Sequence, residues 1–398
     1  MHKLPPPRFA FPPPVMVCRM FASLFSFLLS LCGHSRYALI QPKVFIIAMF
    51  ASEANVWLNS PEFNVFEQSY AIPGLSPVYP RVYCTKIESV CLVTTGEGEI
   101  NAASTISALV YSGSFNLTST YFLIAGIAGI SPKVATIGSV TLARYAVQVG
   151  LQYELDAREI PPGLPFGYFA QGTTGPGRPP ARWVGTEVFE LNDALRHAVY
   201  DYATTATLSD TPDAQAARAL YSASSAFRKA TAGPNIVLCD TATSDQYWSG
   251  NLLARAFENT TRVWTNGAGE YCTTQQEDNG TLNVLLRAAV AGIVDFSRIV
   301  VMRAGSDFDR PHPGQTGYDN LVGPTPGFAP ALSNLYLAGV QIVRGILDEW
   351  ETTFAAGLKP TNYIGDAFGT LNGSGQRDFG PSSAEMLHEE YTGTHGHS

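Results

Sequence analysis

Continuous apolar runs recur along the chain, and each has the length of one buried strand. The clearest occupy residues 43–50, 89–95, 120–129, 138–148, 235–243 and 297–307. A run without polar alternation is typical of a strand in a parallel sheet that is covered on both faces. Segments with helical spacing lie between these runs, at residues 101–112, 193–203, 213–229, 247–258, 280–292 and 329–356. Strands that alternate with helices predict an α/β fold, with a mostly parallel central sheet between helices in three layers.

The pattern shows no internal repeat and no clear domain boundary. We therefore expect a single domain over residues 41–398, preceded by a leader at residues 1–40. Residues 160–183 form a long segment rich in Pro, Gly and aromatic side chains. Loops of that length are commonly functional, so this segment is a candidate lid or edge.

Composition supports a globular protein and narrows its partners. Of the 398 residues, 45% are hydrophobic and 15% are charged, so the chain has ample apolar surface to bury. The formal net charge is −8, and Lys and Arg are not clustered. An acidic chain without a basic patch is a poor ligand for nucleic acid or for an anionic membrane surface.

The leader resembles a secretory signal. A proline-rich basic start is followed by Arg19 and by an apolar run over residues 20–32, which is too short to span a bilayer. A true start at Met16 or Met20 would leave that signal in place. Later apolar stretches are short, broken by Gly or interrupted by Arg and Asp. We expect a secreted or cell-surface protein with no transmembrane helix in the mature chain.

Cysteines and glycosylation sequons agree with that location. Four cysteines follow the leader, and none has the CxxC spacing of a zinc site: Cys84, Cys91, Cys239 and Cys272. The pair Cys84–Cys91 is the easiest to close as a disulfide, across a short hairpin. Asn-X-Ser/Thr triplets begin at Asn116, Asn259 and Asn372, although such triplets also arise by chance.

The stretch LVTTGEGEINAASTISALV, residues 92–110, predicts a strand, a tight glycine loop and a helix. The loop lacks the third glycine of a dinucleotide site, because Asn101 stands at that position, and it lacks the Lys of a P-loop. Gly96 and Gly98 would clear space for a ligand, while Glu97 and Glu99 are expected to face solvent or cap the helix. An ordinary strand–helix turn is the alternative.

Several such junctions are expected at one edge of the sheet. In open α/β sheets, ligands bind beyond the carboxyl ends of the strands. The relevant junctions are residues 49–53, 94–101, 125–129 and 303–309. Gly126 and Gly129 would let the backbone of the third junction approach a ligand closely.

The order of these pieces resembles the nucleoside phosphorylase superfamily. TGEGEINAA is followed by AGIAGISPKVATIGSVTLARYA, then TQQEDNGTLNVLLRAA, then IVVMRAGSDFDRP. With CDTATSDQYWSG and RAGSDFDRPHPG, the fuller match resembles the purine nucleoside permease family over roughly residues 42–347. The resemblance implies a nucleoside phosphorylase-like domain that binds purine nucleosides such as adenosine, inosine and guanosine. It implies no cofactor and no metal, and it allows a homo-oligomer.

Glycosidic cleavage of a purine nucleoside passes through a cationic sugar while charge builds on the departing base. Asp307 matches the superfamily's Ser-Asp acid, which would protonate or hydrogen-bond the base. The alternatives are a helix N-cap or an ion pair with Arg303 or Arg310. If the match to the superfamily's motif is shifted by two residues, Asp309 takes the place of Asp307.

Glu277 matches the glutamate that accepts the ribose hydroxyls. The superfamily's second glutamate is replaced here by Asn279, which changes the expected sugar contacts. A capping cluster at the start of the 280–292 helix is the alternative. Asn279 also begins a sequon, and a glycan there would be incompatible with a site.

The segment after CDTATSDQ provides further candidates. Tyr247 and Trp248 would stack on the base, although aromatic residues at a helix start more often belong to the core. Asp240 lies at the matching strand and would orient the site.

Departures from the superfamily bear on the chemistry. Phosphorylases hold phosphate with arginines near the first and third strand ends, where this chain has Glu53 and an apolar run. A carboxylate would repel phosphate. Related nucleosidases carry a water-activating glutamate near this point, which makes Glu53 a candidate base, with a solvent-facing helix cap as the alternative. Arg144 and Lys133 remain as candidate phosphate ligands.

Three functions follow from these residues. The first is a nucleosidase, with Glu53 as base and Asp307 as acid. The second is nucleoside binding that assists transport, which would require a partner because no spanning helix is expected. The third is a phosphate-dependent phosphorylase. Release of free base with and without phosphate would separate them.

Overall fold

The computed structural model describes residues 39–58, 60–373 and 375–382. The elements below belong to one unit that begins at Leu39. The predicted leader lies outside the described residues, except for Leu39 and Ile40. Ile40 already belongs to the fold, because it forms a parallel bridge with Phe115.

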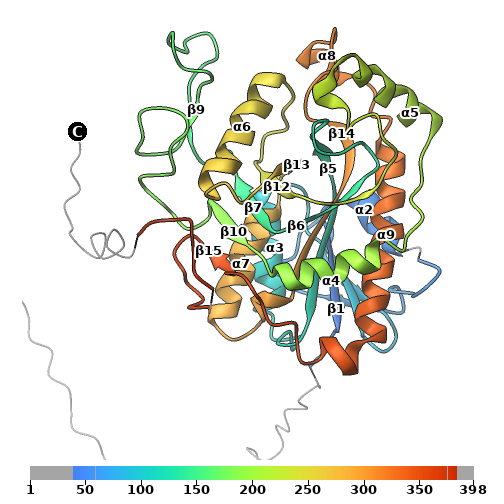
Figure 1. Ribbon diagram of the computed structural model, residues 1–398. Helices are drawn as coiled ribbons and strands as arrows, with labels where there is room; N and C mark the ends of the chain where they lie inside the picture. Colours follow the sequence, from blue (N-terminus) through green and yellow to red (C-terminus); the bar gives the residue numbers. More distant parts are fainter. Residues whose placement is uncertain (1–38, 59, 374, 383–398) are drawn as a thin grey trace, which may run out of the picture. The chain divides into compact units, whose positions relative to one another are not determined.

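A large mixed sheet forms the centre of the fold (Figure 1). Strand β1 (Val44–Ala48) is buried along its whole length and pairs in parallel with β4 (Val90–Thr94) and β5 (Tyr121–Ile130). Strand β14 (Ile299–Phe308) adds a long parallel ladder on β5. These are four of the predicted apolar runs, and their burial on both faces explains why they lack polar alternation.

The rest of the sheet contains both kinds of pairing. Strands β6 (Val140–Ala143) and β11 (Ile236–Leu238) are parallel to each other, and so are β7 (Tyr145–Gln148), β12 (Asp240–Thr243) and β13 (Tyr271–Gln275) in turn. Antiparallel ladders join β13 to β5 and β6 to β14. The edges are also antiparallel: β2 (Gln68–Ala71) and β3 (Arg81–Cys84) at one, β10 (Val188–Glu190) and β15 (Gly365–Asp366) at the other. A separate hairpin joins β8 (Tyr153–Glu154) to β9 (Tyr168–Phe169).

Helices cover both faces of this sheet, which confirms the predicted three-layer α/β architecture. On one face, Phe45 and Ile47 pack with α3 (Glu99–Val110) and α7 (Asp278–Val290). On the other, Val44 and Ile46 pack with α2 (Ala51–Leu58), α4 (Asp193–Ala203) and α9 (Phe328–Asp348). The described residues also form the α-helices α5 (Pro212–Ala219), α6 (Asn251–Trp264) and α8 (Gly317–Val322). Figure 1 shows α9 running along the sheet beside α4.

In the described part of the chain, two disulfides form. Cys84 and Cys91 face each other in the β3–β4 ladder and are bonded, as predicted. A second disulfide joins Cys239, just before β12, to Cys272 in β13. In the described part of the chain, no helix combines the length and the apolarity that crossing a membrane requires.

Candidate functional site

A cavity of about 290 Å³ lies where the carboxyl ends of β1, β13 and β14 meet the end of β5. Three of its lining residues are the predicted carboxylates Glu53, Glu277 and Asp307. The first comes from α2, the second from the start of α7, and the third from the end of β14. Ligands bind at such strand ends in α/β sheets, so the fold gathers these acids where the sequence predicts a site.

Glu53 is buried in the first turn of α2 and accepts two backbone hydrogen bonds. Met49 N–H donates to Oε2 at 2.8 Å, and Ile127 N–H donates to Oε1 at 2.7 Å. Burial raises the pKa of Glu53 to about 8, even though the nearby Arg303 guanidinium lowers it. This is not a solvent-facing cap: it is a fixed carboxyl that gains or loses a proton near neutral pH.

Glu277 lies at the N-cap of α7 but does not cap that helix. The first backbone N–H groups of α7 are instead satisfied by Gln275 Oε1, which accepts from Glu277 N and Asp278 N at 2.7 and 2.8 Å. Glu277 Oε1 accepts from Gly98 N at 3.0 Å, and Oε2 accepts from Arg303 at 3.2 Å. Burial raises the pKa of Glu277, and Arg303 opposes that rise.

Arg303 was not among the predicted site residues, yet it lines the cavity near Glu53 and Glu277. Its guanidinium is buried and donates to Asp278 at 2.6 Å, to Glu277 at 3.2 Å and to the Ile127 carbonyl at 3.2 Å. Its position inside the apolar run of β14 was the available signal, because an arginine in a buried strand must have acidic partners.

A β-bulge in β14 separates Asp307 from Arg303. Arg303 pairs with Gly126 of β5, and Asp307 pairs with Gly129, because Ser306 is an extra residue in the ladder. Arg303 and Asp307 are four residues apart, and on a regular strand their side chains would share a face. Their partners Gly126 and Gly129 are only three residues apart and face opposite ways, so the bulge makes the two side chains of β14 leave in different directions. The bulge therefore keeps the acid away from the guanidinium.

Asp307 consequently has hydroxyl partners rather than a cation. Ser306 Oγ donates to Asp307 Oδ1 at 2.7 Å, and the Tyr247 hydroxyl also hydrogen-bonds to this carboxyl. Burial raises the pKa of Asp307, which favours the protonated carboxyl. Neither predicted ion pair, with Arg303 or with Arg310, forms. Asp309 instead binds Arg310 at 2.7 Å and accepts from the Tyr271 hydroxyl, so it is a buried structural carboxylate outside the cavity lining.

Aromatic side chains form the wall above Asp307. Tyr247 is 60% exposed and lines the cavity, so its ring is available to a ligand. Trp248 also lines the cavity, but it is buried against Phe257, with ring centroids 4.9 Å apart. Phe50 and Phe328 also line the cavity, with centroids 6.5 Å apart.

Gly96 and Gly98 of the glycine loop lie outside the cavity lining. Gly96 and Gly98 both have positive φ, which a side chain would strain, and Gly98 N–H positions Glu277. Glu97 is exposed at the rim and lines the cavity. Glu99 does not face solvent freely: it is half-buried, receives a hydrogen bond from Gln148, and burial raises its pKa to about 7.

Gly126 makes room for the site residues themselves. A Cβ there would lie 2.4 Å from Met49 Cε, 2.5 Å from Arg303 Nη1 and 2.8 Å from Glu53 Oε1. The predicted close approach is therefore real, but it is made by these side chains, and Gly126 itself does not line the cavity.

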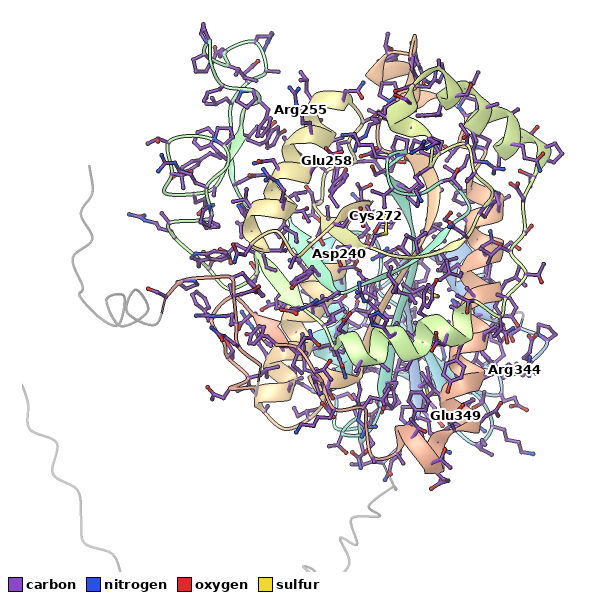
Figure 2. The ribbon with its side chains drawn as sticks, in the orientation of Figure 1. Asp240, Arg255, Glu258, Cys272, Arg344 and Glu349 are labelled. Carbon is purple, nitrogen blue, oxygen red and sulfur yellow. A yellow bond between two sulfur atoms is a disulfide. The ribbon has the colours of Figure 1, made fainter. Side chains whose placement is uncertain are left out.

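Two other predicted binding residues lie outside the cavity lining. Asn279 is 2% exposed, accepts from Thr243 Oγ1 at 2.7 Å and donates to the Thr186 carbonyl at 2.7 Å. Asp240 lies at the amino end of β12 (Figure 2), where its carboxylate accepts from the N–H groups of Arg144, Tyr145 and Glu270. Both side chains form hydrogen bonds within the protein interior. A motif match gives only the residue type, so it could not separate this structural role from ligand binding.

The candidate phosphate ligands are also elsewhere. Arg144 is bonded to Glu190 through Nε at 2.8 Å, and Lys133 is bonded to Glu258 of α6 (Figure 2) at 2.9 Å. Neither lines the cavity, where Arg303 is the one cationic side chain among the described lining residues. Within the same described ranges, no group of three or more His, Cys, Asp or Glu side chains is placed to hold a metal ion.

Comparison with known proteins gives a consistent family. A family model described as purine nucleoside permease matches residues 41–359. A purine nucleoside permease of Candida albicans is 44% identical over 354 residues, covering 87% of this chain and 85% of its own. A probable purine nucleoside permease of Schizosaccharomyces pombe is 40% identical over 328 residues, covering 79% of this chain and 91% of its own.

Solved structures with a similar fold include two nucleosidases. The 5′-methylthioadenosine/S-adenosylhomocysteine nucleosidase of Neisseria meningitidis is 14% identical, with a TM-score of 0.44 over 78% of this chain and 100% of its own. The corresponding enzyme of Helicobacter pylori is also 14% identical, with a TM-score of 0.45 over 78% of this chain and 99% of its own.

Proposed function

The chain belongs to the purine nucleoside permease family, and from that premise we propose that it binds purine nucleosides and cleaves their N-glycosidic bond by hydrolysis. The observation that carries the proposal is the shared cavity of Glu53, Glu277 and Asp307. Its volume, about 290 Å³, is at the lower end of the range for small-ligand pockets. Adenosine, inosine and guanosine are the substrates to test.

Each acid has a role in this proposal. Asp307, protonated, donates its proton to the purine as the bond from the sugar C1′ to the base breaks and its electron pair leaves with the base. Ionised Glu53 takes a proton from the water whose oxygen bonds to C1′. Glu277 accepts the ribose hydroxyls and, as a carboxylate, favours the cationic sugar. The products are ribose and free base.

Hydrolysis is preferred to phosphorolysis because of the charges around the cavity. Its one described cation, Arg303, is already bonded to Asp278 and Glu277. A phosphate dianion would meet carboxylates without a free positive partner, and like charges at short range are repulsive. Water needs no such partner.

The test is release of free purine base from each nucleoside, with and without phosphate. We expect release without phosphate, and a fall of at least about 100-fold in kcat for Glu53→Gln and for Asp307→Asn, the usual scale for losing a general base or acid. Matched controls are the exposed carboxylates Glu351→Gln and Asp213→Asn, which should keep wild-type rates.

A second function follows from the names of the relatives. Proteins called permeases in two yeasts suggest a role in nucleoside uptake, in which this chain would bind nucleoside and deliver it or its base to a partner. Nucleoside binding without base release would favour this function, and release only with phosphate would favour a phosphorylase. Either result would exclude the proposed hydrolysis.

A further inference from the structure

Asparagine sequons are a feature of this chain that the cavity does not explain. Four Asn-X-Ser/Thr triplets occur in the sequence, beginning at Asn116, Asn259, Asn279 and Asn372. A glycan attached to any of them must leave through the Nδ2 atom and reach solvent without breaking the fold. The structure separates the four on that requirement.

Asn116 meets the requirement. It lies in the loop between α3 and β5, and its Oδ1 accepts hydrogen bonds from Thr118 Oγ1 at 2.8 Å and Thr118 N at 3.3 Å. Within the described residues, Asn116 Nδ2 donates no hydrogen bond. It is also not one of the fully buried unpaired atoms, so it retains some contact with solvent. Thr118 is exposed. Asn116 is half-buried as a residue, but the atom that would carry the glycan is unbonded and not fully buried, and its sequon partner already contacts the same side chain.

Asn279 and Asn259 fail it. Asn279 Nδ2 donates a hydrogen bond to the Thr186 carbonyl, and its side chain is 2% exposed. Asn259 is half-buried within helix α6, and both threonines of its triplet, Thr260 and Thr261, are buried. For Asn372, the third residue of the triplet lies outside the described residues, so nothing is built on it.

The position of Asn116 also leaves the cavity open. Strand β5 begins at Tyr121, a few residues after Asn116, and its other end, at Ile127 to Gly129, lines the cavity. A strand rises about 3.3 Å per residue, so roughly 20 Å separate the two ends. A glycan at Asn116 would extend from the edge of the sheet that is remote from the site.

We infer that Asn116 is a site of N-linked glycosylation in this protein. The bond forms between Asn116 Nδ2 and the anomeric carbon of an oligosaccharide, from a lipid-linked oligosaccharide diphosphate donor. The lipid diphosphate leaves, and Nδ2 gives up one proton. The inference rests on entry into the secretory pathway, which the two disulfides of the described chain support. It does not rest on the chemistry of the cavity.

The test is expression of the full chain in a eukaryotic host, with treatment of the culture medium and of the cell lysate by an endoglycosidase. We expect wild-type protein to shift in electrophoretic mobility, with peptide mass locating the modified residue at position 116. Asn116→Gln and Thr118→Val should lose that peptide's modification, whereas Thr118→Ser, which keeps the sequon, should retain it. Base release or nucleoside binding by Asn116→Gln should equal wild type.

Two outcomes would overturn the inference. Secreted wild-type protein with an unmodified position 116 would exclude the site itself. Protein that is found only in the lysate and is unmodified would exclude the site together with the secretory location. Neither outcome bears on base release, so a failure here is distinct from a failure of the proposed hydrolysis.

Discussion

Glu53 shows how one environment decides the chemistry of a residue. In water its carboxyl would be ionised at neutral pH, but burial raises its pKa to about 8. A base with that pKa works best in neutral to mildly alkaline solution. The identity of the residue was predictable from the strand–helix junction, whereas its burial depends on Ile127 and Arg303, which come from distant strands.

The raised pKa of Glu53 predicts an unusual pH dependence of stability. The folded state keeps a proton up to about pH 8 that the unfolded chain gives up near pH 4.5. This contribution is fully present below pH 4.5 and is lost as pH rises to about 8, a change on the order of 3–5 kcal/mol. Glu53→Gln cannot titrate, so its free energy of unfolding should fall less than wild type's between pH 5.5 and 8.5.

Urea unfolding across that range measures the difference, and Glu351→Gln, which removes an exposed carboxyl, should follow wild type. Parallel curves for wild type and Glu53→Gln would mean that Glu53 is not held protonated in the folded protein.

Other residues show that sequence motifs cannot separate residues that line the cavity from buried structural residues. The motif match led to Asp307, Glu277 and Glu53, which share the cavity. It also led to Asn279 and Asp240, which are buried hydrogen-bonding residues elsewhere. A motif records residue types in order, but whether a polar side chain opens on a cavity or satisfies backbone groups depends on strand register.

At the scale of elements, the contact between β5 and α2 depends on the absence of one side chain. Gly126→Ala would place a Cβ within 3 Å of Met49, Arg303 and Glu53. We expect a loss of about 1–3 kcal/mol in stability and a fall in base release of about tenfold or more, because the displaced atoms belong to the site.

Gly233→Ala is the control, since a Cβ at that exposed glycine meets nothing within 4 Å. Thermal unfolding and base release should both be near wild type for Gly233→Ala. Wild-type base release by Gly126→Ala would show that the positions of Glu53 and Arg303 are not critical.

Most elements follow from the apolar pattern. The runs at residues 43–50, 89–95 and 120–129 became β1, β4 and β5, and the helix at 193–203 has the predicted bounds. Strand β13 and helix α2 were not predicted. The sequence of β13, YCTTQ, is short and polar, and it becomes a strand because neighbours β12 and β5 pair with it. The helix of residues 213–229 ends early as α5 and continues as short 3₁₀ turns.

On the scale of the whole molecule, the two disulfides seen among the described residues link different lengths of chain. Cys84 and Cys91 are 7 residues apart, and Cys239 and Cys272 are 33 apart. Loop-closure entropy predicts a stabilisation of about 2 kcal/mol for the short loop and about 4 kcal/mol for the long one. Replacing Cys239 and Cys272 together with Ala should therefore lower the free energy of unfolding more than the same change at Cys84 and Cys91.

Denaturant unfolding of the two double variants tests this order, and each pair is the control for the other because all four side chains are buried. An equal or larger loss for the short loop would show that native packing, rather than the constraint on the unfolded chain, determines the effect.

The extra residue in β14 has a consequence for how such a site changes over time. Ser306 has no partner on β5, so Gly305 and Asp307 occupy consecutive positions of the ladder, opposite Ala128 and Gly129. Loss of the Ser306 codon would remove the bulge, leave the acid opposite the same glycine, and remove the hydroxyl that donates to it. A deletion at this point would thus preserve the ladder and take away one hydrogen bond, whereas a deletion in a regular part of the strand would move every following side chain to the other face.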